Sequence, residues 1–281
     1  MMIRSGLLGR SILASRSPEL HEQEAAAQGL DLSYELFDFS DRGWSDDELG
    51  TVMGRLAVEG FSGFNVTYPF KQAVVPLLDN LDESALAVGA VNTVAVREGR
   101  LIGYNTDMAG FRGSFLATLT GAATGRIVQL GAGGAGAAVA SALLSVGVGR
   151  LDLVDVDQAR ATSLASELST RFPGSDIRVA TPDSIDTTTA DGIVNATPVG
   201  MVGKAGMPLD ADRILSTHWV ADIIYFPPET ELLRAARAKG CRTMNGVGMV
   251  VEQAARAFEI ITGQKADIVR MATTLQYPAI G

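Results

Sequence analysis

The sequence contains very little cysteine, and its charge is mainly of one sign. Among 281 residues the one cysteine is Cys241, so no disulfide can form within the chain and a reducing compartment, the cytoplasm, is expected. Acidic residues number 32 and basic residues 23, which gives a formal net charge of −9. This charge argues against a nucleic-acid partner and against binding to an anionic membrane surface. Any anionic ligand must therefore be bound by local groups.

The sequence also shows little that would direct it to a membrane or out of the cell. Met1–Arg4 leads into an apolar patch that Arg10 interrupts, which makes a poor secretion signal. Residues 127–149 carry no charge and are long enough to span a bilayer, but they are rich in glycine and alanine and contain a turn pattern. A buried strand followed by a buried helix explains this run better than a membrane span. The length of the chain favours two domains.

The most informative stretch is a glycine-rich turn between an apolar segment and a run of small residues. Residues 127–130 predict a buried strand, and a helix is expected over residues 137–146. Between them, Gly131, Gly133 and Gly136 have the spacing of a turn that binds dinucleotide phosphates at a helix N-terminus. The residues of this turn that are expected to bind the cofactor are Gly131, Ala132, Gly133, Gly134 and Ala135.

A second predicted strand, residues 151–155, follows the helix and ends in an acidic residue. Asp155 lies about twenty residues beyond the last glycine, where a Rossmann unit places the carboxylate that binds the ribose hydroxyls. The order of strand, glycine turn, helix, strand and acid favours a dinucleotide-binding domain over a glycine-rich turn in some other α/β protein. Asp155 has an alternative role as the N-cap of the next helix, for which Asp157 is better placed.

The first half of the chain alternates strands and helices in the same way, so a mostly parallel sheet is expected there too. Polar residues follow the ends of its predicted strands, namely Asn65, Thr67, Lys71, Asn105 and Asp107. Open α/β sheets bind ligands outside the carboxyl ends of their strands. A lysine and an aspartate in one cleft can form a proton-handling pair, in which the carboxylate orients the amine. A surface lysine and a helix-capping Asp107 are the alternative.

Six motifs, in order along the chain, resemble those of a known family. They are Asn65-Val-Thr67-Tyr-Pro69-Phe-Lys71, Gly89-Ala-Val-Asn92-Thr93, Asn105-Thr-Asp107, Asn195-Ala-Thr-Pro-Val-Gly200, Asp222-Ile-Ile-Tyr225-Phe-Pro227, and Gly248-Met249 with Gln253. In these motifs nearly the whole chain resembles the shikimate dehydrogenase family. The resemblance implies an α/β fold, with a substrate-binding and catalytic domain over residues 1–107 and a Rossmann-type NAD-binding domain over residues 108–245. The C-terminal helices, residues 246–281, are expected to pack back on the substrate domain.

The resemblance also implies roles for individual residues. Lys71 and Asp107 would be the catalytic pair, with Lys71 taking the proton of a ring hydroxyl while hydride passes to the nicotinamide. The residues expected to bind the substrate are Ser15, Ser17, Thr67, Asn92, Asp107, Tyr225 and Gln253. Outside the glycine turn and Asp155, the residues expected to bind the cofactor are Asn195, Thr197, Gly248 and Met249. No metal site is expected.

Departures from the family pattern bear on the substrate and the cofactor. Glu22 follows His21 where the biosynthetic enzymes usually have asparagine, and this pair resembles the quinate/shikimate dehydrogenases of catabolism. Residues 154–157 lack the arginine with which NADP-using members meet the 2′-phosphate. Asp155 would repel that phosphate, so NAD is the expected cofactor. Arg160, one helical turn further on, is interpreted as a solvated helix residue.

The expected activity is NAD-dependent oxidation of a ring secondary hydroxyl of shikimate or quinate, by a monomer or a homodimer. Both substrates stay open, because one ring hydroxyl separates them and the shape of the pocket decides. Alternatives on the same frame are an aminoshikimate or aminoquinate dehydrogenase and the biosynthetic NADPH-dependent shikimate dehydrogenase. An alternative of a different class is a non-catalytic regulator that senses NAD, against which the intact Lys71 and Asp107 count.

Overall fold

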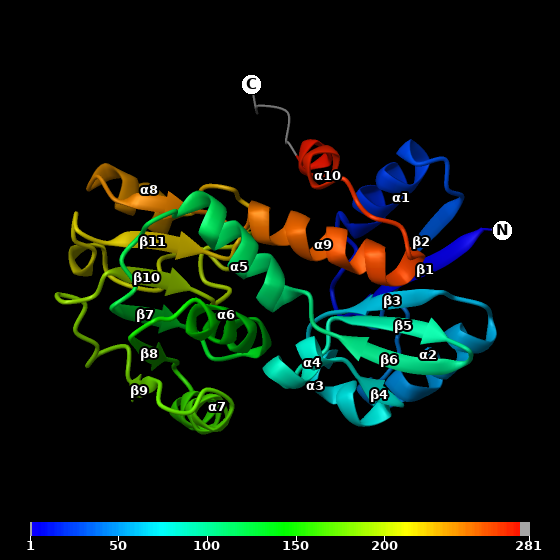
Figure 1. Cartoon of the computed structure of the whole chain (residues 1–281), viewed down its shortest axis with the longest axis horizontal. Coiled ribbons are helices and arrows are strands. Elements are labelled where there is room, and N and C mark those ends of the chain that lie inside the picture. Colours follow the sequence, from blue (N-terminus) through cyan, green and yellow to red (C-terminus); the bar gives the residue numbers. More distant parts are fainter. Residues whose placement is uncertain (1, 276–281) are drawn as a thin grey trace. The chain divides into compact units, whose positions relative to one another are not determined.

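The structure is a computed structural model that describes residues 2–275. Contacts divide these residues into two compact units: unit 1 runs to Thr106 and resumes at Val251, and unit 2 is Asp107–Val250. Each unit is an α/β structure built on a six-stranded sheet (Figure 1). No helix in the described part of the chain is long and apolar enough to cross a membrane. The uncharged run of residues 127–149 instead forms a strand and a helix, as the sequence predicts.

Unit 1 has a sheet of mixed strand direction in the order β2-β1-β3-β5-β6-β4. Its strands are β1 (Ile3–Gly9), β2 (Leu32–Asp38), β3 (Gly63–Val66), β4 (Asn80–Leu81), β5 (Thr93–Arg97) and β6 (Arg100–Tyr104). β2, β1 and β3 are parallel neighbours, whereas β5 is antiparallel to both β3 and β6. Glu98 and Gly99 join β5 to β6, and both have positive φ, 52° and 77°. A two-residue turn of this kind reverses the chain, which explains the antiparallel pair.

The helices of unit 1 cover this sheet with apolar side chains. They are α1 (Ser17–Ala27), α2 (Leu49–Val58), α3 (Phe70–Ala73), α4 (Glu83–Val88), α9 (Val247–Thr262) from Val251 onward, and α10 (Ile268–Thr274), with 3-10 turns at Asp46–Glu48 and Val75–Leu77. α2 illustrates how the sequence sets a helix. The spacing of Ser45 and Glu48 predicts a capping box, and this box is present. The apolar face that follows it, Leu49, Val52, Met53 and Leu56, is buried.

The C-terminal helix of the described chain packs on its first helix. α10 lies beside α1 (Figure 1), and Arg270 binds Glu24 through two hydrogen bonds, Nε to Oε2 and Nη2 to Oε1, both of 2.7 Å. Burial of Glu24 opposes its ionisation, but the bonds from Arg270 lower its pKa below the ordinary value. A buried carboxylate with a bidentate guanidinium partner is a strong, specific tie. It fixes residues from the two ends of the chain to each other within unit 1.

Unit 2 has a fully parallel sheet in the order β12-β11-β10-β7-β8-β9. Its strands are β7 (Arg126–Leu130), β8 (Arg150–Val154), β9 (Asp176–Ala180), β10 (Gly192–Asn195), β11 (Trp219–Asp222) and β12 (Arg242–Met244). This is the strand order of a Rossmann fold, which confirms the predicted fold class. The direction of progress along the chain changes between β7 and β10. Ligands of such sheets bind at this point, outside the carboxyl ends of the strands.

The helices of unit 2 are α5 (Asp107–Thr118), α6 (Gly134–Ser145), α7 (Gln158–Arg171) and α8 (Glu231–Ala238), with a 3-10 turn at Ala211–Arg213. α6 carries no charge, and every residue from Gly136 to Leu144 is buried. Its small side chains allow close packing against β7 and α5, which are its neighbours in the unit. The same smallness and lack of charge made this run resemble a membrane span in the sequence.

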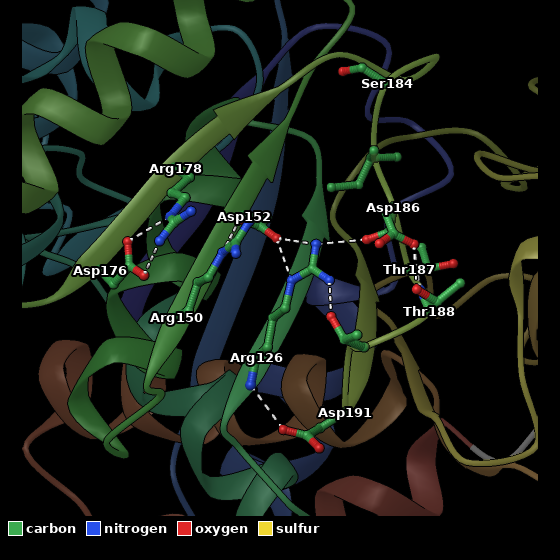
Figure 2. Close-up of polar contacts among 12 residues, drawn as sticks. Arg126, Arg150, Asp152, Asp176, Arg178, Ser184, Asp186, Thr187, Thr188 and Asp191 are labelled. Atoms are coloured by element: carbon green, nitrogen blue, oxygen red, sulfur yellow. Dashed lines mark hydrogen bonds and ion pairs between the residues drawn. The ribbon is translucent and has the colours of Figure 1, made fainter.

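Charged residues near the amino ends of these strands form a cluster that links β7 to β8 (Figure 2). Asp152 is almost completely buried and accepts hydrogen bonds from Nε of Arg126 and Nε of Arg150, both at 2.8 Å. Arg126 also donates to the Thr189 hydroxyl and to the Asp186 carbonyl. The bonds to Asp152 stabilise unit 2. Because the cluster lies at the edge of the sheet opposite the carboxyl ends of the strands, it does not line the predicted ligand site.

Candidate functional site

The glycine-rich turn joins the carboxyl end of β7 to α6. Gly131 has a φ of 99°, and a Cβ built on it would lie 2.7 Å from the Ala196 carbonyl carbon, so this position requires glycine. A Cβ on Gly136 would lie 2.3 Å from the Gly131 oxygen, so here too the backbones approach each other closely. α6 begins at Gly134 with Gly133 as its N-cap, earlier than the predicted start at residue 137. The first N–H groups of α6 therefore belong to the turn itself.

This turn has the chemistry to accept the phosphates of a dinucleotide. A Cβ built on Gly133 would meet no atom within 4 Å, so the space beside the turn is open. The free N–H groups of the first turn of α6 and the positive end of its dipole supply donors for an anion. They provide locally the positive potential that this acidic chain lacks as a whole. The role of residues 131–135 in cofactor binding stays a prediction.

A residue that the sequence analysis missed braces the turn from within the sheet. The side chain of Gln129, in β7, is fully buried. Its Nε2 donates to the Gly131 carbonyl at 2.9 Å and to the Gly136 carbonyl at 2.8 Å. One amide group thus ties the first glycine of the turn to the last. The signal that could have found it is a polar residue inside the otherwise apolar strand of residues 127–130.

Asp155 is the first residue after β8, and its carboxylate lies against the glycine-rich turn. Oδ2 accepts a hydrogen bond from the Ala132 N–H at 2.8 Å, and Oδ1 accepts one from the Asp157 N–H at 2.9 Å. The carboxylate does not cap α7. The N-cap of α7 is Asp157, whose side chain accepts from the Arg160 N–H at 3.2 Å, as the sequence predicts. Asp155 is therefore available at the turn, with one lone pair on each oxygen left for a ligand.

Arg160 is more than the solvated helix residue that the sequence suggested. Its side chain is about half exposed, at 53%, but Nη1 lies 3.7 Å from Asp155 Oδ1 and Nη2 lies 3.4 Å from Asp157 Oδ2. A guanidinium beside Asp155 offsets part of its negative charge. The electrostatics at the end of β8 thus depend on Asp155 and Arg160 together.

The loop after β10 is shaped by Asn195. Its Nδ2 donates to the Val199 carbonyl at 3.1 Å and to Asp222 Oδ1 at 3.0 Å, and its Oδ1 accepts from the Thr197 N–H at 3.0 Å and the Thr197 hydroxyl at 2.7 Å. These four bonds use the whole hydrogen-bonding capacity of the amide. Asp222 is completely buried, and burial raises its pKa. Asn195 therefore fixes the loop that faces Gly131, together with Thr197, whose hydroxyl also accepts from the Val199 N–H at 3.1 Å. The role of both residues in cofactor binding stays a prediction.

In unit 1, a chain of hydrogen bonds leads to Asn92. The Tyr34 hydroxyl donates to Asn65 Oδ1 at 2.8 Å, and Asn65 Nδ2 donates to the Asn92 carbonyl at 3.2 Å and to the Thr93 hydroxyl at 2.9 Å. Asn65 is thus a structural link between strands. The Asn92 amide donates to the Thr106 hydroxyl at 2.9 Å and accepts from the Thr106 N–H at 2.9 Å. Within residues 2–275 its second amide hydrogen has no acceptor, so it can donate to a ligand.

Lys71 lies on α3, next to the carboxyl end of β3. The preceding residue, Phe70, is buried with its ring 4.5 Å from that of Phe39, and its N–H donates to the Thr67 carbonyl at 2.8 Å. The Lys71 carbonyl accepts from the Val91 N–H at 2.8 Å, which ties α3 to the residue before Asn92. Phe70 therefore fixes Lys71 beside Thr67 and Asn92 at one end of the sheet. Asn105, which donates to the Ala90 carbonyl at 2.9 Å, serves this scaffold.

Ser15 and Ser17 lie at the start of α1. Ser17 followed by Pro18 predicts a helix that starts at Pro18 with Ser17 as its N-cap, but Ser17 does not have this role. The helix begins at Ser17, its N-cap is Arg16, and no side chain caps it. The Ser15 hydroxyl instead donates to the Ser17 hydroxyl at 3.1 Å, so these two residues, both predicted to bind the substrate, are in contact. The Ser17 hydroxyl also interacts with the phenol of Tyr34, whose pKa burial raises.

The remaining predicted residues lie on α5, after β11 and on α9. Asp107 is the first residue of α5 and is buried, at the end of the helix where the dipole favours a carboxylate. Tyr225 follows β11. Gly248 and Met249 lie in the first turn of α9, with Met249 buried, and Gln253 follows one turn later and is half-buried.

The two units divide the predicted site residues between them. Unit 1 contains Ser15, Ser17, Thr67, Lys71, Asn92 and Gln253. Unit 2 contains Asp107, Tyr225 and the predicted cofactor residues, namely Gly131, Ala132, Gly133, Gly134, Ala135, Asp155, Asn195, Thr197, Gly248 and Met249. In the part of the chain that the structure describes, no group of three or more histidine, cysteine, aspartate or glutamate residues could hold a metal ion.

Comparison with known proteins agrees with this architecture. Residues 7–94 match the shikimate dehydrogenase substrate binding domain, and residues 246–276 match the shikimate 5′-dehydrogenase C-terminal domain. The chain is 48% identical to a shikimate dehydrogenase (NADP(+)) of Pseudarthrobacter chlorophenolicus, over 95% of this chain and 92% of the relative. It is 41% identical to a quinate/shikimate dehydrogenase (NAD(+)) of Corynebacterium glutamicum, over 96% of each protein.

A solved structure matches the fold across both units. Quinate dehydrogenase from Corynebacterium glutamicum in complex with NAD has a TM-score of 0.92 and 41% identity, and the match covers 97% of this chain and 98% of that one. The relatives named here match nearly the whole chain at 41–48% identity. Together with the Rossmann unit and its glycine turn, they show that the chain is an oxidoreductase that uses a nicotinamide dinucleotide and belongs to the shikimate dehydrogenase family.

Proposed function

We propose that this protein catalyses the reversible, NAD-dependent oxidation of a ring secondary hydroxyl of shikimate or quinate to the 3-dehydro ketone. The observation that carries the choice of NAD is the position of Asp155, whose carboxylate accepts the Ala132 N–H of the glycine turn at 2.8 Å. The relatives and the solved structure are named as dehydrogenases of shikimate or quinate, and this supports a ring acid of this class as the substrate.

The proposed chemistry separates the two hydrogens that leave the alcohol. The nicotinamide supplies the acceptor for the hydride from the ring C–H when it is bound. The hydroxyl proton would pass to Nζ of Lys71. Only the neutral amine can accept this proton. Asp107 would accept hydrogen bonds from a ring hydroxyl and orient the amine. In the reverse direction Lys71 returns the proton to the alkoxide oxygen.

Substrate binding is proposed to use neutral donors in addition to this pair. The Asn92 amide keeps one hydrogen for a ring hydroxyl, because its other hydrogen goes to Thr106 and its oxygen accepts from Thr93 and Thr106. Ser15 and Ser17 would donate to the substrate carboxylate together with Thr67 and Tyr225. Hydroxyls suit this task because their hydrogens rotate to the acceptor and add no charge. Gln253 is proposed to bind a ring hydroxyl from α9.

The preference for NAD is proposed from charge at the end of β8. A 2′-phosphate beside Asp155 would meet a fixed, nearly buried carboxylate, whereas the ribose hydroxyls of NAD would donate to it. A second candidate, NADP-dependent reduction of the ketone, is favoured by one specific observation. Arg160 lies 3.7 Å from Asp155 and could turn to a phosphate. The names of the relatives include both cofactors.

A steady-state assay decides between these candidates. The full-length protein is mixed with quinate or shikimate and with NAD or NADP, and reduced nicotinamide is followed by its absorbance. The proposal expects a kcat/KM with NAD about tenfold or more above that with NADP. A higher kcat/KM with NADP would favour the second candidate. No turnover of either ring acid with either cofactor would overturn both candidates.

A further inference from the structure

The strand before the glycine turn contains a polar side chain whose burial is unfavourable by itself. Gln129 has 0% exposure, as do Ile127 and Val128 beside it in β7. Its Oε1 has no hydrogen-bond partner among the described residues, although the atom is buried. An apolar residue at this position would avoid the cost of an unpaired amide oxygen. Glutamine at this position therefore lowers the stability of the fold relative to an apolar residue. The two hydrogen bonds that Nε2 makes to the glycine turn indicate why a glutamine is present.

Each of these bonds controls one peptide plane of the turn. The carbonyl of Gly131 accepts from Nε2 at 2.9 Å, and the N–H of the same peptide, that of Ala132, donates to Asp155 at 2.8 Å. Gln129 and Asp155 thus bind the two ends of one planar group. The carbonyl of Gly136 accepts from Nε2 at 2.8 Å, and the N–H of its peptide, that of Ala137, donates to the Gly133 carbonyl at 2.8 Å.

These two fixed peptides enclose a segment whose N–H groups have no hydrogen-bond acceptor among the residues that the structure describes. Residues 133–135 lie between them, and their N–H groups are the donors at the start of α6. A ligand that binds such donors loses affinity if the backbone must first be ordered, because the conformational entropy lost on ordering makes the binding free energy less favourable. A brace that orders the turn beforehand removes that cost. Glycine-rich backbone needs such a brace more than other sequences, since glycine has the greatest freedom to lose.

We propose that Gln129 is a positioning residue for the dinucleotide: it orders the glycine turn so that the N–H groups of residues 133–135 meet the cofactor's pyrophosphate without rearrangement. This inference rests on the proposed function only in that the turn binds a dinucleotide. It does not depend on which ring acid is oxidised or on the choice between NAD and NADP, because both cofactors carry the same pyrophosphate. ADP-ribose, which keeps the pyrophosphate but lacks the nicotinamide, is therefore a suitable probe.

The test replaces Gln129 without changing the volume of the strand. Gln129→Met keeps the length of the side chain and removes both donors. We expect the Kd for NAD, NADP and ADP-ribose to rise by about three- to tenfold alike, whereas kcat at saturating cofactor and the KM for the ring acid change less than about twofold. Thr187→Val is the matched control, because it removes a buried side-chain hydrogen bond to the Arg213 carbonyl in the same unit and outside the turn.

The outcomes separate a positioning role from a merely structural one. A fall in melting temperature with unchanged Kd values, as expected of the control, would overturn the inference. If Gln129→Met does not fold, Gln129→Leu is measured, together with amide hydrogen exchange of the wild type without cofactor. The brace predicts slow exchange at the N–H groups of Ala132 and Ala137, and fast exchange would overturn it. Wild-type protein that binds ADP-ribose but oxidises neither ring acid would refute the proposed substrate and support the brace if the variants bind more weakly.

Discussion

Oδ2 of Asp155 accepts a hydrogen bond of 2.8 Å from the N–H of Ala132, so the acid at the end of β8 is fixed against the glycine turn at the end of β7. The two residues come from neighbouring parallel strands, and the contact therefore depends on the sheet register as much as on either residue. It keeps the carboxylate beside the glycine turn, at the carboxyl ends of the neighbouring strands β7 and β8.

The first prediction concerns Asp155 and the choice of cofactor. We expect Asp155→Ser to lower kcat/KM with NAD and to raise it with NADP, because the repulsion of a 2′-phosphate, on the order of one to several kcal/mol, is removed. The ratio of the two values should fall by about tenfold or more. Steady-state kinetics with both cofactors on both proteins give this ratio. An unchanged ratio would show that Asp155 does not select the cofactor.

Arg160→Met serves as the matched variant, since it removes the neighbouring charge and leaves Asp155 in place. If Arg160 only offsets the charge of Asp155, the preference for NAD should become stronger. A selective loss of activity with NAD in this variant would contradict the roles given to both residues.

The second prediction concerns Lys71. We expect Lys71→Met to lower kcat by a factor of about a hundred or more, because positioned proton transfer contributes about that much. The Kd for the cofactor should change little, since Lys71 belongs to unit 1 and the glycine turn to unit 2. Steady-state rates at saturating substrate and cofactor measure kcat, and cofactor titrations measure the Kd. Lys265→Met, at an exposed lysine of unit 1, is the control, and near-normal turnover of Lys71→Met would refute the proton-transfer role.

The third prediction concerns Gln253 on α9. Replacement by alanine should raise the KM for the ring acid more than it lowers kcat, as expected when a contact is equally strong in the ground and transition states. Initial rates over a range of substrate concentrations give both constants. Gln264→Ala changes an exposed glutamine beyond the end of α9 and should alter neither. A loss of folding in Gln253→Ala with unchanged KM would instead indicate a packing role.

The fourth prediction concerns pH and His21. Burial lowers the pKa of His21 from 6.5 to about 4, and its ring stacks on Tyr34 with centroids 4.7 Å apart. The folded state thus binds this proton less readily than the unfolded state. The free energy of unfolding is unaffected above pH 6.5 and should fall as the pH drops toward 4, by up to about 3 kcal/mol from this group.

His21→Phe should remove that part of the pH dependence, because phenylalanine does not titrate. The change keeps the stacking on Tyr34, and it breaks no hydrogen bond of Nδ1, which is buried without a partner in the described structure. Urea unfolding of both proteins at pH 7 and pH 5 measures the difference. His218, whose pKa burial also lowers, contributes equally to both proteins and cancels in the comparison. The same fall in stability in the variant would show that His21 is not responsible.

The fifth prediction concerns the charged cluster of Figure 2. We expect Asp152→Ala to destabilise the protein by about 2–3 kcal/mol, because it leaves two guanidinium groups near a buried site without their shared carboxylate. Asp176→Ala breaks the exposed pair with Arg178 and should have little effect. Thermal unfolding compares the two variants. Equal shifts would show that burial does not distinguish these ion pairs.

Local sequence was sufficient to predict most of the elements. The apolar strand and glycine turn of residues 127–136, the capping box before α2 and the Glu98–Gly99 hairpin each follow from short-range rules of propensity and turn geometry, and each is present. The two-residue strand β4 was missed because so short a run has no periodicity of its own. Ser17 was predicted as a cap from its type and from Pro18, but the helix begins one residue earlier.

Tertiary structure decided what the polar residues do. Asn65, Asn105 and Asn195 look alike in the sequence as polar residues after strands, yet their amides serve the scaffold because neighbouring strands and loops bring carbonyl and hydroxyl groups into reach. The sequence determined that a carboxylate ends β8 and that glycines form the turn. Only the parallel pairing of β7 with β8 placed Asp155 on Ala132, since a hydrogen bond between residues distant in the sequence depends on register and packing and leaves no local pattern in the chain.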